Sequence, residues 1–156
     1  MQGGFSWILI ALLTAGLLWA AVGDWRTRTI PNWLNGAIAL GAIPFWWASG
    51  LSLWPDVALQ VGVALAVLFV FFLAFQIGQM GGGDVKMLFA LSLWLPPMAV
   101  FQLLVIMAIA GGVLTVALLI PHRMLKQSGN PEIPYGIAIA FGGLWLIGER
   151  FLNHFG

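Results

Sequence analysis

Six apolar stretches, separated only by turn-forming residues and isolated charges, constrain this chain more than any other feature. They cover residues 5–22, 33–48, 56–77, 85–95, 98–120 and 135–152. An α-helix needs about 20 apolar residues to cross the hydrocarbon core of a bilayer. Charged residues make up only 7% of the chain, whereas a water-soluble domain needs about a quarter. We therefore predict an all-α polytopic integral membrane protein with six transmembrane helices, which form one domain over residues 1–156.

The basic residues predict the orientation of these helices, because cytoplasmic loops carry an excess of lysine and arginine. One side of the membrane would hold Arg26, Arg28, Lys86, Arg123 and Lys126, and the other side only Arg150. We therefore place the connections after the first, third and fifth stretches in the cytoplasm and both termini on the non-cytoplasmic side. No basic residue precedes the first stretch, so we expect a retained span and not a removable signal peptide. Because tryptophan favours membrane interfaces, we expect an outer belt of Trp46, Trp47, Trp54 and Trp94.

Several classes of function do not fit this composition. No run of basic residues is present that would neutralise the phosphates of a nucleic acid. The chain has no cysteine, which excludes disulfides and thiolate metal sites. Its two histidines, His122 and His154, have no cluster of ligand-type residues around them in the sequence. We therefore expect no nucleic-acid partner, no bound metal and no cofactor.

The fourth stretch is too short to cross a bilayer unaided. It starts directly after Asp84 and ends at residue 95, directly before Pro96 and Pro97. Irregular backbone at membrane depth is tolerated only where protein or water surrounds it. We expect either that the loop of residues 76–83 enters the membrane boundary or that this helix lies in a thinned or protein-lined region.

Two of the five acidic residues lie at the predicted cytoplasmic edge of the membrane, where Asp24 ends the first stretch and Asp84 precedes the fourth. Ionisable groups near a bilayer are costly and are functional candidates for that reason. Two carboxyls in one site do not both ionise easily, so one keeps a proton while the other is charged. Such a pair activates a water as nucleophile and polarises a carbonyl, which is the chemistry of aspartic proteases. We predict that Asp24 and Asp84 form this pair.

Each acid also has an interpretation that involves no chemistry. Asp24 alone fits a span end beside Arg26, and Asp84 alone fits an N-cap of the fourth helix. Asp56 is predicted to cap the third helix on the outer face. Within the pair, the helix dipole predicts that Asp24, at a helix C-terminus, holds the proton more often than Asp84, at a helix N-terminus. Arg26 and Arg28 oppose this assignment.

A run of three glycines directly precedes Asp84. Gly81, Gly82 and Gly83 provide backbone without Cβ atoms, and another backbone can approach such a segment closely. A peptidase needs this property, because its substrate lies extended against the catalytic acid. The same run also fits a flexible hinge between two helices.

Three polar residues near the pair each have two interpretations. Lys86 is either a topology anchor at the membrane surface or a group that tunes the acid or binds substrate. Asn32 and Asn35 follow Pro31, and we expect them to cap the second helix; the alternative is that they bind substrate backbone.

Three segments, in this order, resemble the motifs of prepilin peptidases. Residues 24–32 (DWRTRTIPN) resemble the segment around their first aspartate, in which a basic stretch and Ile-Pro-Asn follow the acid. Residues 81–86 (GGGDVK) resemble their Gly-x-Gly-Asp motif with a lysine two residues on. Residues 131–136 (PEIPYG) resemble their Ile-Pro-Tyr/Phe-Gly element. Each match alone is modest, whereas the three together are specific.

This resemblance implies a six-helix aspartic endopeptidase of the bacterial cytoplasmic (inner) membrane that needs no metal and no cofactor. Its partner would be the precursor of a type IV pilin-like protein, whose short basic leader is removed at the cytoplasmic face. By motif, Asp24 and Asp84 would be catalytic. The residues that would bind substrate or shape the site are Gly81, Gly83, Lys86, Pro134, Tyr135 and Gly136.

The chain departs from the larger members of that family in one respect. Those members carry a cytoplasmic segment with paired cysteines and also methylate the new N-terminus of the pilin. With no cysteine and no room for such a segment between its first two stretches, the chain resembles the short form associated with Flp-type (tight-adherence) pili. The resemblance therefore implies a peptidase without methyltransferase activity.

Two other functions also fit a pair of acids in a membrane protein. A small transporter would use Asp24 and Asp84 as a proton or cation relay, although transport sites usually lie near the midplane of the bilayer. A non-catalytic assembly subunit would use the acids only to fix the packing of its helices. Cleavage of a precursor peptide separates these two functions from the peptidase.

Overall fold

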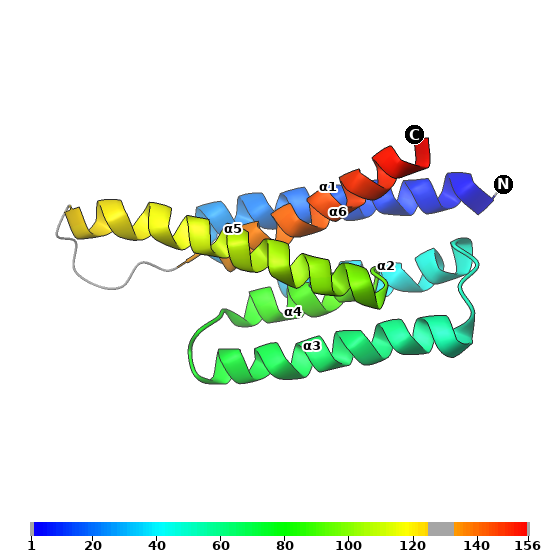
Figure 1. Ribbon diagram of the computed structural model, residues 1–156, viewed down its shortest axis with the longest axis horizontal. Helices are drawn as coiled ribbons and strands as arrows, with labels where there is room; N and C mark the ends of the chain where they lie inside the picture. The colour runs from blue at the N-terminus through cyan, green and yellow to red at the C-terminus, as the bar shows by residue number, and fades with distance from the viewer. Residues whose placement is uncertain (1, 125–132, 156) are drawn as a thin grey trace.

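The computed structural model describes residues 2–124 and 133–155, and in these residues the chain forms six α-helices (Figure 1). They are α1 (Gln2–Thr27), α2 (Asn32–Ala48), α3 (Ala58–Gln76), α4 (Gly82–Ser92), α5 (Pro97–Met124) and α6 (Tyr135–Phe155). A turn of π-helix, Leu53–Val57, precedes α3. Each of the six predicted stretches overlaps one of these helices, which confirms the all-α class, although the stretch 85–95 runs three residues past the end of α4.

Three helices contain segments that are long and apolar enough to cross a membrane. These segments are Gly4–Thr27 in α1, Leu53–Gln76 at α3 and Pro97–Ile120 in α5. The protein is therefore a membrane protein with several candidate spans. The number of six spans and their orientation remain predictions. The two termini lie at one end of the bundle, and the connection from α3 to α4 lies at the other end (Figure 1).

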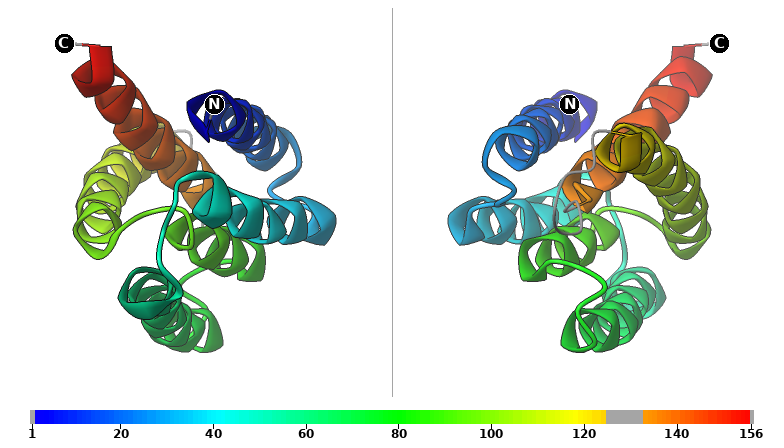
Figure 2. Two further views of the ribbon diagram at one scale, coloured as in Figure 1. Left: turned by 90° about the vertical axis from the view of Figure 1, so that its right-hand side faces the viewer. Right: turned by 90° about the vertical axis from the view of Figure 1, so that its left-hand side faces the viewer.

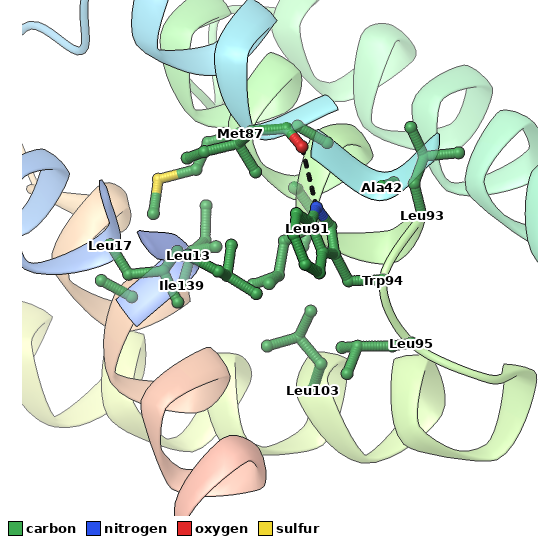
Figure 3. Packing of buried hydrophobic residues seen from close by; sticks show 14 of the residues in the cluster. Leu13, Leu17, Ala42, Met87, Leu91, Leu93, Trp94, Leu95, Leu103 and Ile139 are labelled. Carbon is green, nitrogen blue, oxygen red and sulfur yellow. Dashed lines mark hydrogen bonds between the residues drawn. The ribbon is translucent and has the colours of Figure 1, made fainter. Parts of the chain in front are cut away.

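Helix α4 is the shortest of the six and is largely buried. It packs against α2, α3 and α6, and the end views show it among these helices (Figure 2). Its residues Met87, Leu88 and Leu91 are fully buried. Figure 3 shows Met87 and Leu91 in the core beside Leu17 of α1 and Ile139 of α6. The start of α4 is thus held in place from several sides.

The connection from α4 to α5 is also buried, which explains how so short a helix is accommodated. Leu93, Trp94 and Leu95 are each at most 7% exposed. The indole N–H of Trp46 donates to the carbonyl of Leu93, and the indole N–H of Trp94 donates to the carbonyl of Ile38, both at 2.8 Å. Figure 3 shows the second of these bonds. Protein therefore surrounds the irregular backbone, as the protein-lined alternative required.

The position expected for Trp94 is wrong. We expected it in the outer interfacial belt, but it is 5% exposed and packs against Phe45 with ring centroids 4.9 Å apart. Its ring also lies so close to Gly41 that a Cβ there would meet it at 2.9 Å. Trp47 and Trp54, by contrast, are exposed. The indole N–H of Trp94 bonds to the backbone carbonyl of Ile38 inside the bundle. The polar group of this side chain is therefore paired there, and Trp94 serves in packing.

Candidate active site

Asp24 lies in the last turns of α1, where the chain leaves the helix. The backbone N–H of Arg28 donates to the carbonyl of Asp24 at 3.0 Å. Arg28 has a φ of 54°, a left-handed conformation of the kind that often ends a helix. The hydroxyl of Thr27 donates to the carbonyl of Gly23 at 2.9 Å and adds to this ending. The side chain of Asp24 is only 4% exposed, so it faces the bundle and is not a solvated span end.

Asp84 lies in the first turn of α4, and the glycine before that turn makes room for its carboxyl. The N-cap position is Gly81, with an extended backbone, so the interpretation of Asp84 itself as the N-cap is wrong. A Cβ on Gly81 would lie 2.9 Å from Oδ2 of Asp84, closer than side chains tolerate. Asp84 is 8% exposed. Of the three glycines, Gly81 is thus the one that packing against the acid requires.

The N-terminus of α6 meets the Asp24 carboxyl. The backbone N–H of Ile137 donates to Oδ2 of Asp24 at 3.2 Å, and the backbone of Gly136 interacts with the carboxyls of both Asp24 and Asp84. A Cβ on Gly136 would lie 2.8 Å from Oδ2 of Asp24. Pro134 is fully buried just before the helix. The two acids predicted from sequence are therefore brought together, and α6 contacts both.

Tyr135 contributes to the placement of α6 through its ring. A Cβ on Gly111 of α5 would lie 3.4 Å from that ring, so the ring packs against the glycine. The N–H of Tyr135 donates to the carbonyl of Ile133 at 2.9 Å. Pro131 and Glu132, which belong to the same predicted element, lie outside the described residues. The structure thus gives Tyr135 a packing role at the α5–α6 contact.

The electrostatics of the pair follow from burial and from the backbone donors. Burial raises the pKa of the Asp84 carboxyl to about 7, and the negative charge of Asp24 acts in the same direction. For Asp24, the hydrogen bond from Ile137 stabilises the ionised form. The dipole argument from sequence considered only the helix that carries Asp24, whereas the positive end of a different helix, α6, points at this carboxyl. The proton assignment drawn from sequence stays a prediction, because both carboxyls are buried and only Asp24 receives this donor.

The connection between α1 and α2 packs on the start of α4. A Cβ on Gly83 would lie 3.4 Å from Cβ of Ile30 and 3.5 Å from the Ile30 backbone. The ammonium group of Lys86 donates to Oδ1 of Asn32 at 2.9 Å, and Nδ2 of Asn35 donates to the carbonyl of Gly83 at 3.1 Å. These contacts link the segment after Asp24 directly to the residues on both sides of Asp84.

These contacts correct one expectation and add residues that the sequence did not indicate. No side chain caps α2, whose N-cap residue is Pro31, so the capping role expected for Asn32 and Asn35 is wrong. Ile30 and Ile137 were not predicted as site residues. Ile30 lies in the Ile-Pro-Asn segment, so the sequence motif could have indicated it. Ile137 acts through its backbone N–H, and no residue type indicates such a role.

The surroundings of the pair are apolar on the α5–α6 side. A groove of about 550 Å³ lies between these helices, and Ile109, Val113, Ile137 and Phe141 are among the residues that line it. The residue whose amide holds Asp24 is therefore also a wall of this groove. Within residues 2–124 and 133–155, no group of three or more histidine, cysteine or acidic side chains is placed to hold a metal ion.

A helical membrane protein with two buried carboxyls at one end, both in contact with the backbone of a third helix, has the construction of a membrane aspartic peptidase. The model of the type IV leader peptidase family matches residues 11–116, more than half of the chain, and the chain belongs to this family. It is thus an aspartic peptidase of the inner membrane that removes leader peptides from prepilins. The comparisons with curated proteins and with solved structures gave no match.

The family match favours the peptidase over the transporter and the assembly subunit. It covers Asp24, Asp84 and the glycines before Asp84, but it ends within α5 at residue 116. The contribution of α6, through Gly136 and Ile137, lies beyond the matched residues and comes from the structure.

The substitution Gly136→Ala is expected to lower the rate of leader cleavage about 10²-fold, because a displacement of about 1 Å in a catalytic site has an effect of this size. The added Cβ would lie 2.8 Å from Oδ2 of Asp24 and 2.7 Å from Cδ1 of Ile30, so α6 has to move away. Cleavage of a co-expressed prepilin, followed on gels, measures the effect. Gly148→Ala is the matched control, because a Cβ there meets nothing within 4 Å. Equal rates for the two variants would contradict the close approach of α6.

Proposed function

We propose that Asp24 and Asp84 are the catalytic pair and that they cleave the leader of an Flp-type prepilin at the cytoplasmic face. The observation that carries this proposal is the pair itself, because both carboxyls are at least nine-tenths buried and both contact the backbone of Gly136. Buried carboxyls that share a site hold one proton between them. A solvated or purely structural acid has no need of this arrangement.

In this mechanism the two acids have different roles. Asp24, whose carboxylate receives the Ile137 hydrogen bond, takes a proton from a water molecule. The water oxygen attacks the carbonyl carbon of the scissile peptide bond, while protonated Asp84 donates to the carbonyl oxygen. Asp24 then gives its proton to the leaving nitrogen and the C–N bond breaks, while Asp84 takes a proton back from a hydroxyl of the tetrahedral diol, so the pair again holds one shared proton. The proton therefore starts on Asp84, opposite to the assignment drawn from the helix dipole.

The other predicted site residues would serve this pair by shaping it. Gly81 and Gly136 leave room for the carboxyls of Asp84 and Asp24, respectively, and Gly83 lies against Ile30 of the α1–α2 connection. The remaining three would act indirectly, by holding helices in place. Pro134 and Tyr135 stand at the start of α6, and Lys86 joins α4 to Asn32 of α2.

Asp24→Asn and Asp84→Asn are each expected to lower cleavage of a co-expressed Flp-type prepilin by about 10²- to 10⁴-fold, the range for loss of a general acid or base. Asp56→Asn is the matched control. Asp56 is exposed and accepts hydrogen bonds from the N–H and the hydroxyl of Ser52, at 3.1 and 2.8 Å, near the start of α3. It is expected to keep the wild-type rate. Persistent cleavage by either inserted Asp24 or Asp84 variant would show that the two acids do not form a dyad.

The rate of cleavage is expected to fall as the pH rises above about 7, the value to which burial and Asp24 raise the pKa of Asp84. Above it the pair loses its shared proton, so kcat/KM falls roughly tenfold per pH unit. The same proton is bound more tightly in the native state than in the unfolded chain. Its contribution to stability is thus present at acidic pH and lost as the pH rises.

A pH–rate profile of the purified enzyme between pH 5 and pH 9 measures this, with thermal melting in the same buffers as the control for unfolding. A flat profile up to pH 9 would contradict a shared proton. Infrared spectra at pH 6 locate the proton: the protonated-carboxyl band is expected to disappear in Asp84→Asn, and its survival there would return the proton to Asp24.

We also propose that the protein is a peptidase only, of the short form. The support is the absence of cysteine from the chain and the connection of only four residues between α1, which ends at Thr27, and α2, which starts at Asn32. Purified protein that cleaves the prepilin is expected to transfer no methyl group from S-adenosylmethionine to the new N-terminus. Mass spectrometry of the cleaved pilin measures this, and a mass gain of one methyl group would refute the proposal.

A further inference from the structure

Asn35 is a buried amide that binds the backbone next to Asp84 and that no capping role explains. It lies in the first turns of α2 and is 4% exposed. Its Nδ2 donates to the carbonyl of Gly83 at 3.1 Å, across 48 residues of sequence. Its Oδ1 is buried and has no hydrogen-bond partner in the described part of the chain. The carbonyl of Gly83 can only accept a hydrogen bond, so Nδ2 is the atom that faces it.

The unpaired oxygen shows which half of the amide matters. A buried acceptor without a partner lowers the stability of the fold. An apolar side chain of similar size, such as leucine, fills the same space and has no such acceptor. The favourable contribution of Asn35 is therefore its donor to Gly83. That donor holds the peptide unit that joins Gly83 to Asp84, because the carbonyl of one residue and the N–H of the next belong to a single planar group.

We propose that Asn35 is a positioning residue for catalysis, which fixes the Gly83–Asp84 peptide and thereby the direction of the Asp84 carboxyl. Gly83 is the second residue of α4 and has no side chain of its own, so contacts from other elements add to the helix in fixing its peptide planes. Ile30 packs against one side of it, and Asn35 supplies the directional contact. This proposal rests on the proposed role of Asp84.

Asn35→Leu tests the proposal, because it keeps the volume and removes the donor. We expect kcat for leader cleavage to fall at least tenfold with KM within twofold of wild type, since the carboxyl is misdirected while substrate binding surfaces are kept. Membrane insertion and thermal stability in detergent are expected to stay at or above the wild-type level, because the unpaired oxygen is removed as well. A merely structural asparagine would lose stability and activity together.

Gln60→Leu is the matched control. Gln60 of α3 is 5% exposed and, like Asn35, has a buried side-chain oxygen without a partner in the described residues. Its replacement removes a buried amide of the same kind from another helix, and kcat is expected to stay within twofold of wild type. An equal loss of kcat in both variants would overturn the specific role of Asn35.

The remaining outcomes separate this proposal from the proposed function. Wild-type kcat in Asn35→Leu, while Asp84→Asn is inactive, overturns the positioning role alone. Activity of Asp84→Asn overturns the catalytic pair, whatever Asn35→Leu does. If Asn35→Leu does not insert, the smaller Asn35→Ala is measured in the same way. Failure of both variants to insert assigns Asn35 to folding and overturns the proposal.

Discussion

The approach of the α6 N-terminus to Asp24 is the interaction on which the rest of the site depends. It links the first helix to the last through the hydrogen bond from the Ile137 N–H to Oδ2 of Asp24, at 3.2 Å. An unpaired carboxylate inside a membrane protein is costly, and backbone N–H groups at a helix N-terminus are donors without partners in their own helix. Each group thus satisfies the other. Because the contact involves backbone, it requires Gly136, since any side chain there would occupy the space of the carboxyl.

The second acid depends on a different constraint, the shortness of α4. A helix that crossed the full bilayer would have continued beyond residue 92, but this one ends at Ser92 and the chain reverses inside the bundle. The reversal is possible because the indoles of Trp46 and Trp94 bond to nearby backbone carbonyls and protein covers Leu93 and Leu95. Since α4 is enclosed by its neighbours, its first turn, with Asp84, is placed within reach of both α1 and α6.

The sequence predicted the helices well because their signal is composition. Residues 5–22 and 98–120, for example, are apolar over most of their length, and both fall within single helices. The two acids were also predictable, since a carboxyl at a membrane edge is rare and therefore conspicuous. Spacing alone did not show that they meet, because 60 residues of chain separate Asp24 from Asp84 (84 − 24 = 60). That step needed the tertiary structure.

The parts that the sequence did not predict have a common physical cause. Trp94, Asn35 and Ile137 all act through hydrogen bonds in which one partner is a backbone group, and backbone groups are the same at every position. Side-chain type led to wrong predictions for two of them. Tryptophan is common at membrane interfaces and asparagine at helix starts, but Trp94 and Asn35 are both buried. The N-terminus of α6 beside Asp24 was missed for the same reason, because its donors are backbone N–H groups of another helix.

This dependence on backbone also explains the composition of the site. Near the two acids the chain has glycines at positions 81, 83 and 136 and prolines at positions 31 and 134. Glycine allows close approach, and proline restricts the backbone before a helix begins. Two buried carboxyls are thus placed mainly by main-chain geometry, with few polar side chains around them. For a site between lipid-facing helices this is an advantage, because every additional polar side chain would need a partner of its own, whereas helix ends provide donors that the fold already contains.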